Sequence, residues 1–303
     1  DRRAALPEPV ARPRRSVVSD HVLLCGAWDE GPGYPRTTSL RQGLLAAGCS
    51  VGECRVEPLR DKQRLVRTPW RWPSVWWRQR SQRRALLTQL SEAVRRERPR
   101  AVVVPYPGHL LAPAIRATVD VPVVLDLFLS AYDTAVEDRR LVLPGSLLAH
   151  WLQRLDARAC QAADLVVTDT PANAAYAAAL TGLPAERFGW LPVHDPDAPA
   201  APTPWPGGGG PLRLLFFGTG VPLHGLDVLL DAVAAVDGVH LTLVGGSGTD
   251  RATAVARLRD RLALEPAFVA RERLAQLIAD SQLVAGVFGR SGKAQRVVPF
   301  KLV

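Results

Sequence analysis

Two stretches in the C-terminal third of the chain have residue types and spacing that could bind an anion. In the first, the apolar run 212–217 ends in the turn GTGVPLHG, whose glycines let backbone N–H groups approach a ligand closely. A helix expected over 225–235 points its positive end at the same turn. The glycine spacing is not that of a dinucleotide fingerprint, so a plain strand–turn–helix connection remains the alternative. The candidate contacts are Gly218, Thr219, Gly220, His224 and Gly225.

The second stretch is FGRSGKAQRVVPFK, residues 288–301, which carries four basic residues and no acid. Its side-chain charge and the helix that we expect from Pro299 onward both attract anions, although an ordinary solvated basic loop would look the same. We take Lys293 and Arg296 as its candidate anion contacts. Two anion-attracting loops in one α/β half predict a diphosphate ligand.

Polar residues near the expected strand ends of the N-terminal two thirds could line the opposite side of a cleft. The acceptor-side candidates are Gly33, Tyr34 and Arg36. The catalytic candidates are His109, Asp126 and Asp133. Structural alternatives stay open, because His109 could begin a helix, Asp133 could form an Asx turn, and Arg36 could pair with a surface acid.

A basic, tryptophan-rich window lies between Arg60 and Arg84, with nine basic residues, one acid and four of the eight tryptophans. Arginine interleaved with tryptophan suits an anionic lipid surface. It would also suit nucleic acid, or a solvated helix face with tryptophans under a loop. We favour the membrane and expect no nucleic-acid partner. The predicted membrane contacts are Trp70, Arg71, Trp72, Trp76, Trp77 and Arg78.

Strand-like apolar runs alternate with helical patterns from residue 21 onward, which predicts an α/β fold of two Rossmann-like, doubly wound domains facing across a cleft. The proline- and glycine-rich segment 194–211 reads as a linker between domains 21–193 and 212–303, after a basic arm over 1–20. We expect the second domain to be truncated. The predicted strands are 21–26, 51–55, 101–105, 121–126, 164–168, 212–217, 239–244, 267–269 and 282–287. The predicted helices are 38–48, 78–97, 109–117, 146–162, 172–182, 225–235, 250–263 and 271–280.

Composition narrows the protein class. A hydrophobic fraction of 47% with 22% charged residues predicts a globular chain, and no apolar run reaches the roughly 18 residues of a membrane span. The four cysteines form no CxxC pair or Cys/His cluster, which predicts reduced thiols and no zinc site. We therefore expect a cytoplasmic protein, peripheral on the cytoplasmic face of the membrane.

Longer stretches resemble a known family. The segments LRLLFFGTGVPLHGLDVLLDAVAAV, LTLVGGSG and LIADSQLVAGVFGRSGKAQRVVPFKLV resemble the donor domain of GT-B glycosyltransferases of the family 4 type. GYPRTTSLRQGLLAAGCSV, YPGH and LDLFLSAYDT are similar to the acceptor domain of one bacterial subgroup. The resemblance implies transfer of a sugar from a nucleotide diphosphate sugar to a glycan or lipid-linked acceptor, with retention and without a metal or other cofactor. It also implies nucleobase contacts at Phe268, Val269 and Arg271.

The chain departs from the family pattern at three positions. Thr219 and His224 stand where the family has an arginine and a lysine, and Arg296 replaces the first glutamate of a Glu-x7-Glu pair. We interpret the change as relocation, in which Lys293 and Arg296 supply the cations that the first turn lacks. A non-catalytic nucleotide-binding or partner subunit, or a nucleotide-sugar epimerase of the same fold, is the alternative.

Overall fold

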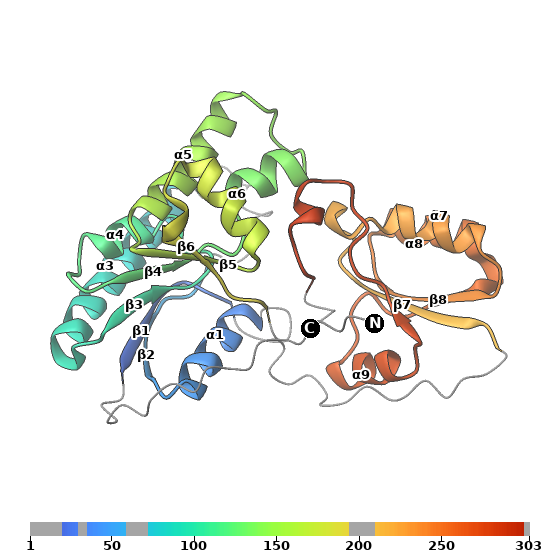
Figure 1. The fold of residues 1–303 in the computed structure, drawn as a ribbon, viewed down its shortest axis with the longest axis horizontal. Coiled ribbons are helices and arrows are strands. Elements are labelled where there is room, and N and C mark those ends of the chain that lie inside the picture. Colours follow the sequence, from blue (N-terminus) through green and yellow to red (C-terminus); the bar gives the residue numbers. More distant parts are fainter. Residues whose placement is uncertain (1–19, 30–34, 59–71, 194–209, 300–303) are drawn as a thin grey trace, which may run out of the picture.

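The computed structural model describes residues 20–29, 35–58, 72–193 and 210–299. They form two parallel β-sheets that lie side by side, each with helices on both faces (Figure 1). The first sheet ends at Trp190 and the second begins at Leu212. The predicted fold class is therefore confirmed.

The first sheet has six parallel strands in the order β2-β1-β3-β4-β5-β6. Short aliphatic runs such as AVVV in β3 are buried on both faces, as is usual for strands of a parallel sheet. The last strand, Phe188–Trp190, was not predicted, because three residues with a central glycine carry no strand pattern. The strands are β1 (His21–Gly26), β2 (Ser50–Arg55), β3 (Ala101–Val104), β4 (Val123–Asp126), β5 (Leu165–Thr168) and β6 (Phe188–Trp190).

Helices cover this sheet unequally. Leu86 and Leu90 of α3, Ile115 of α4 and Cys160 of α5 share one buried cluster with the strands, whereas α1 packs on the opposite face. The side chains of Ser146 and Thr170 accept from backbone N–H groups and so cap α5 and α6. The helices are α1 (Pro35–Ala46), α3 (Trp72–Glu97), α4 (Ala112–Arg116), α5 (Leu147–Gln161) and α6 (Pro171–Thr181).

The second sheet has four parallel strands in the order β10-β7-β8-β9. The strands are β7 (Leu212–Gly218), β8 (Val239–Gly245), β9 (Leu262–Leu264) and β10 (Leu283–Val284). Helices α7 (Leu226–Ala235) and α8 (Gly248–Leu258) lie on one face, and α9 (Arg271–Ala279) lies on the other (Figure 1).

Two predictions in the second sheet are wrong. The helix expected over 250–263 ends at Leu258, and the strand expected over 267–269 lies at Leu262–Leu264 instead. Pairing with β8 explains both changes, because Leu262 and Leu264 extend the sheet next to Leu241 and Leu243. In the first half, residues Asp133–Asp138 form an unpredicted π-helical turn, a feature that is often found at functional sites.

The four cysteines are all described and free. Burial raises the pKa of the Cys25 thiol, and it raises the pKa of Cys160 to about 12, so both thiols are unreactive. Within the described ranges, no helix combines the length and the apolar character that a bilayer crossing requires.

Candidate functional site

The two predicted anion loops lie against each other at the carboxyl edge of the second sheet. The backbone N–H of Phe288 donates to the carbonyl of His224 at 3.1 Å, and that of Gly289 donates to the carbonyl of Leu223 at 3.1 Å. The contact leaves no space for a side chain, because a Cβ on Gly225 would lie 2.3 Å from the carbonyl carbon of Phe288. The structure thus brings together loops that are about seventy residues apart in the chain.

The turn after β7 offers a ligand its backbone groups and the hydroxyl of Thr219. Thr219 is exposed, and Gly225, with a φ of 59°, precedes the first turn of α7. The ring of His224 lies directly over Gly218, where a Cβ would be 2.7 Å from the ring atom Cε1. Gly220 is close to the start of α8, since its Cβ would be 3.0 Å from the backbone nitrogen of Ser247. Ser247 and Asp250 already cap the start of α8, and Asp250 Oδ2 would be 2.5 Å from the same Cβ. Of the two helix N-termini at this edge, the uncapped start of α7 is therefore the one that suits a negatively charged ligand.

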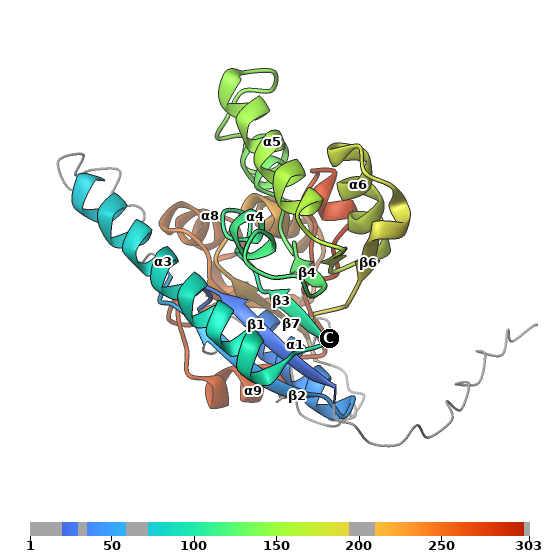
Figure 2. The same cartoon turned by 90° about the vertical axis from the view of Figure 1, so that its left-hand side faces the viewer.

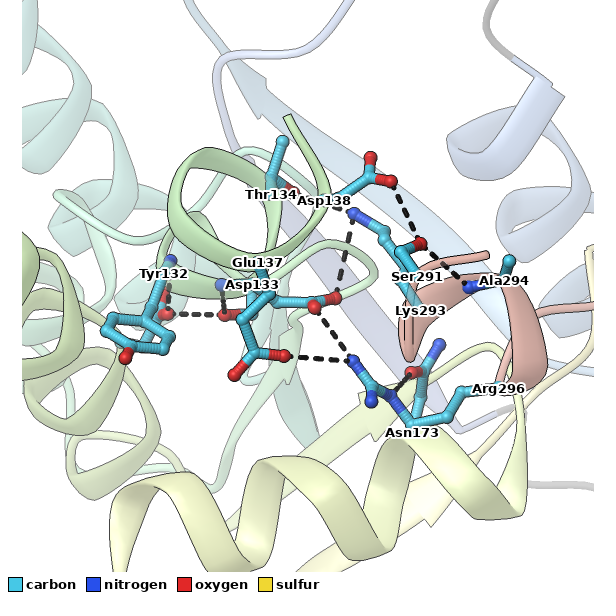
Figure 3. A network of polar contacts seen from close by, with 12 residues as sticks. Tyr132, Asp133, Thr134, Glu137, Asp138, Asn173, Ser291, Lys293, Ala294 and Arg296 are labelled. Atoms are coloured by element: carbon cyan, nitrogen blue, oxygen red, sulfur yellow. Dashed lines mark hydrogen bonds and ion pairs between the residues drawn. The ribbon is translucent and has the colours of Figure 1, made fainter. Parts of the chain in front are cut away.

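Lys293 and Arg296, the other predicted donor contacts, point toward the first half of the molecule (Figure 3). Lys293 is 3% exposed, and its Nζ donates to the hydroxyl of Thr134 at 2.8 Å and lies 3.7 Å from Asp133 Oδ2. Arg296 Nη2 donates to Asp133 Oδ1 at 2.7 Å. Both cations are thus ion-paired with a residue that the sequence analysis assigned to catalysis, and their contact with a diphosphate stays a prediction.

Burial dominates the electrostatics of this cluster. It raises the pKa of the Asp133 carboxyl above its ordinary value, although Lys293 and Arg296 act in the opposite direction. Burial likewise lowers the pKa of Lys293. The guanidinium of Arg296 lies 3.8 Å from the ring centroid of Tyr176, and its Nε donates to Asn173 Oδ1 at 3.3 Å. Side chains from α6 and from the π-helical turn thus hold the basic loop.

Arg36 and Asp126 form a buried ion pair, 2.8 Å between Nη2 and Oδ1. The same guanidinium donates to the carbonyls of Thr168 at 3.2 Å and Leu191 at 2.5 Å. Arg36 therefore pairs with a buried acid and not with the surface acid considered as an alternative. Because the two side chains satisfy each other, this geometry favours a structural role for them. Gly33 and Tyr34 lie outside the described residues.

His109 faces a carboxylate that the sequence analysis did not single out. Its Nε2 lies 3.3 Å from Oδ1 of Asp156, which is fully buried in α5. Asp156 also accepts from Ser130 Oγ at 2.6 Å and from the backbone N–H of Tyr132 at 3.0 Å. Burial acts to raise the pKa of Asp156, but His109 and these hydrogen bonds outweigh it and hold that pKa below its usual value.

A cavity of about 510 Å³ adjoins His109. It opens between α3 and the loops that follow β1, β2 and β3, the edge at which open α/β sheets bind ligands. Its lining includes Ala27, Val56, Gln79, Arg83, His109 and Leu155. Of the predicted catalytic residues, His109 lines this cavity, whereas Asp126 and Asp133 are held in ion pairs.

The remaining predicted residues are the nucleobase contacts, which follow β9, and the membrane contacts at and before the start of α3. Phe268 is 85% exposed, Val269 packs beside Leu277, and Arg271 begins α9; they follow β9 and do not form a strand as expected. Trp77 is 63% exposed and Arg78 is exposed on α3. Trp72 and Trp76 belong to the same helix, but their side chains are outside the described part, as are Trp70 and Arg71.

Sequence reasoning missed Asp156, Asp169 and Asn173. Asn173 donates to Asp169 at 2.6 Å and accepts from Arg296, so it links α6 to the basic loop. The TDTP run at 168–171 offered a signal, since a threonine cap followed by proline marks a helix start at a strand end. Asp156 gave none, because its partners are more than twenty residues away in the chain.

Within the described residues, no group of three or more His, Cys, Asp or Glu side chains could hold a metal ion.

No protein-family model matches the chain, and no curated protein matches it. Solved structures do. Sucrose-phosphate synthase from Thermosynechococcus elongatus is similar over 88% of this chain and 74% of its own, with a TM-score of 0.57 at 14% identity. The lipopolysaccharide outer core galactosyltransferase WaaB is similar over 84% and 70%, with a TM-score of 0.53 at 14% identity.

The chain has the GT-B fold. A third similar structure is Anabaena HepE in complex with UDP, with a TM-score of 0.50 at 14% identity over 87% of this chain and 72% of that one. The first half of the GT-B chain carries the cavity beside His109, and the second half carries the joined glycine and basic loops.

Proposed function

We propose that this GT-B chain is a glycosyltransferase that moves a sugar from a nucleotide diphosphate sugar to a glycan or lipid-linked acceptor, with retention of configuration. The observation that carries the proposal is the joining of the two loops, which gathers glycine backbone, the start of α7 and a basic segment at one sheet edge. The likeness to HepE, solved with UDP and with UDP-glucose, supports a donor of this class.

In this proposal the donor diphosphate lies against the turn after β7, near the hydroxyl of Thr219. Lys293 and Arg296 belong to the adjoining loop and neutralise charge on the departing nucleotide, so the diphosphate competes with Asp133 for them. Glycosyl transfer passes through an oxocarbenium-like state, which cations at the leaving group favour. The segment from Phe268 to Arg271 is the proposed contact for the nucleobase.

The acceptor binds in the cavity beside His109. A histidine beside a buried carboxylate can take the proton of an acceptor hydroxyl, and Asp156, 3.3 Å from Nε2, stabilises the imidazolium that forms. The mostly apolar lining, with Val56 and Leu155, suits a lipid-linked acceptor as well as a glycan. We propose a place for the protein on the cytoplasmic face of a membrane, with α3 and its tryptophans toward the lipid.

Calorimetric titration with UDP, GDP and their sugar conjugates tests the proposal, alongside turnover of the same donors. We expect Thr219→Val to weaken binding of the accepted nucleotide about 3- to 10-fold, which corresponds to one lost hydrogen bond. Thr88→Val, at an exposed position on α3, is the matched control. Binding without transfer or hydrolysis would favour a non-catalytic subunit, and conversion of the donor alone would indicate an epimerase. A chain that binds no nucleotide contradicts the proposal.

A further inference from the structure

The start of α5 and the loop before it project beyond the first sheet in both views (Figures 1 and 2). We call residues 139–154 the apolar tip. Leu147 is 91% exposed and Leu143 is 79% exposed, values far above those of ordinary leucines in a folded domain. The exposed large apolar side chains of the tip are Leu141, Leu143, Leu147, Leu148 and Trp151. Five exposed large apolar side chains within one short segment are typical of an interaction site.

Backbone hydrogen bonds hold the apolar tip in place. The N–H of Leu141 donates to the carbonyl of Ala135 at 2.8 Å, and the N–H of Ser146 donates to that of Leu143 at 3.2 Å. Ser146 also caps α5, its hydroxyl accepting from the N–H of Ala149 at 3.2 Å. The leucines are therefore displayed on a fixed frame.

Polarity changes in one direction along α5. Leu147, Trp151, Arg154 and Arg158 are spaced by four, three and four residues, so they share one face of the helix. Leu147 is at the N-terminal end of α5, which projects from the molecule. Trp151 comes next along the helix, and the two arginines follow it toward the C-terminal end. This is the order of hydrocarbon, interface and phosphate groups across one leaflet of a bilayer.

The charge of the apolar tip fits the same partner. Arg139, Arg140 and Arg154 are exposed, and the sequence holds no acid between Arg139 and Leu155. Within the part of the chain that the structure describes, these three arginines form no ion pair. Arginines free of acidic partners beside exposed leucines complement an anionic lipid surface.

We propose that residues 139–154 dock the protein on an anionic bilayer, with the leucines among the acyl chains and the arginines at the phosphates. This surface is separate from α3, the segment predicted from the sequence to contact lipid. Docking through the apolar tip does not depend on sugar transfer, so the inference goes beyond the proposed function.

Vesicle flotation tests the inference on the whole chain, with phosphatidylcholine alone and with phosphatidylcholine mixed with phosphatidylglycerol. We expect binding to the mixed vesicles, which Leu147→Gln with Trp151→Gln weakens about tenfold or more, since two large apolar side chains no longer enter the lipid. Leu45→Gln with Val255→Gln is the control, because those two apolar side chains are exposed as well and lie outside the apolar tip. Equal binding of both double variants and the native chain overturns the inference, as does equal binding to neutral and anionic vesicles.

A second measurement does not depend on how the glutamine variants fold. In native protein, brominated lipid should quench tryptophan fluorescence, and Trp151→Phe should remove part of that quenching; unchanged quenching overturns the inference. A native dimer that the tip variant abolishes, without vesicle binding, also overturns it, because the surface then belongs to a second copy of the chain. Vesicle binding by a chain that binds no nucleotide upholds the inference while the proposed function fails.

Discussion

Asp156 shows how one buried residue organises the loop beside the cavity. Its carboxylate accepts from Ser130 Oγ and from the backbone N–H groups of Ala131 and Tyr132, and it faces His109. These contacts fix the chain just after β4 and hold the pKa of Asp156 below its ordinary value. Such a carboxylate stabilises the fold above its unfolded pKa of about 4 and loses that effect as the pH falls through its folded pKa.

Asp156→Asn should therefore lower stability most at neutral pH, by about 1–3 kcal/mol, since the new amide group cannot accept all three hydrogen bonds. Between pH values of about 5 and 3 the variant should lose less stability than the native chain, because it lacks the titrating carboxylate. Urea unfolding at several pH values measures both effects. The exposed Asp120→Asn is the control, and parallel pH profiles for native and Asp156→Asn proteins would contradict the argument.

At the scale of elements, α3 serves two purposes along its length. Leu86 and Leu90 bury its middle against the first sheet, whereas residues 77–81 near its start are all exposed. Figure 2 shows this start extending past the sheet. The helix begins at Trp72, six residues before the predicted start, so Trp72, Trp76 and Trp77 belong to the helix itself.

Serine at Trp70, Trp72, Trp76 and Trp77 should reduce binding to anionic vesicles without abolishing it, because the interfacial tryptophans of the basic window would be lost while the apolar tip remains. Co-sedimentation with phosphatidylglycerol-containing vesicles measures the change. Trp190→Ser, at a position 54% exposed on β6, is the matched control. Unchanged vesicle binding by the four-serine variant would show that α3 is not a membrane contact.

At the scale of the whole molecule, one buried cluster joins the two halves. Asp133 belongs to the turn after β4, whereas Lys293 and Arg296 belong to the loop after β10 (Figure 3). Nearby, Ser291 donates to Asp138 at 3.2 Å and Thr170 donates to the carbonyl of Arg296 at 2.5 Å. The relative placement of the donor loops and the first sheet thus depends on few polar contacts.

Asp133→Asn should destabilise the protein by about 3 kcal/mol or more, because it leaves the nearly buried Lys293 without its carboxylate. Adding Lys293→Met should recover part of that loss, since no uncompensated charge then remains buried. Thermal or urea unfolding of the four proteins in this cycle gives the coupling. The exposed pair Asp231–Arg257 is the control, and Asp231→Asn should cost less than about 1 kcal/mol. Additive losses at Asp133 and Lys293 would contradict the prediction.

Apart from β6, the succession of strands and helices and the parallel, two-sheet architecture could be predicted from local sequence patterns. Aliphatic runs such as 101–104 and the caps at Ser146 and Thr170 act locally, so they can be recognised without knowing the fold. The glycine turn at 218–225 and the basic loop at 288–296 were also recognisable, because short stretches define them. Errors arose where pairing between distant segments decided the outcome, as for the helix end at Leu258 and β9.

The partners of the charged residues could be found only once the packing of the chain was known. The separation in sequence is 90 residues for Arg36 and Asp126 and 163 for Arg296 and Asp133, and no local spacing encodes such pairs. The same is true of the exposed leucines at 141–147, whose pattern resembles that of a buried segment. An ion pair or an exposed surface depends on which elements the fold brings together, and burial, which sets the strength of each charge interaction, exists only once the chain is packed.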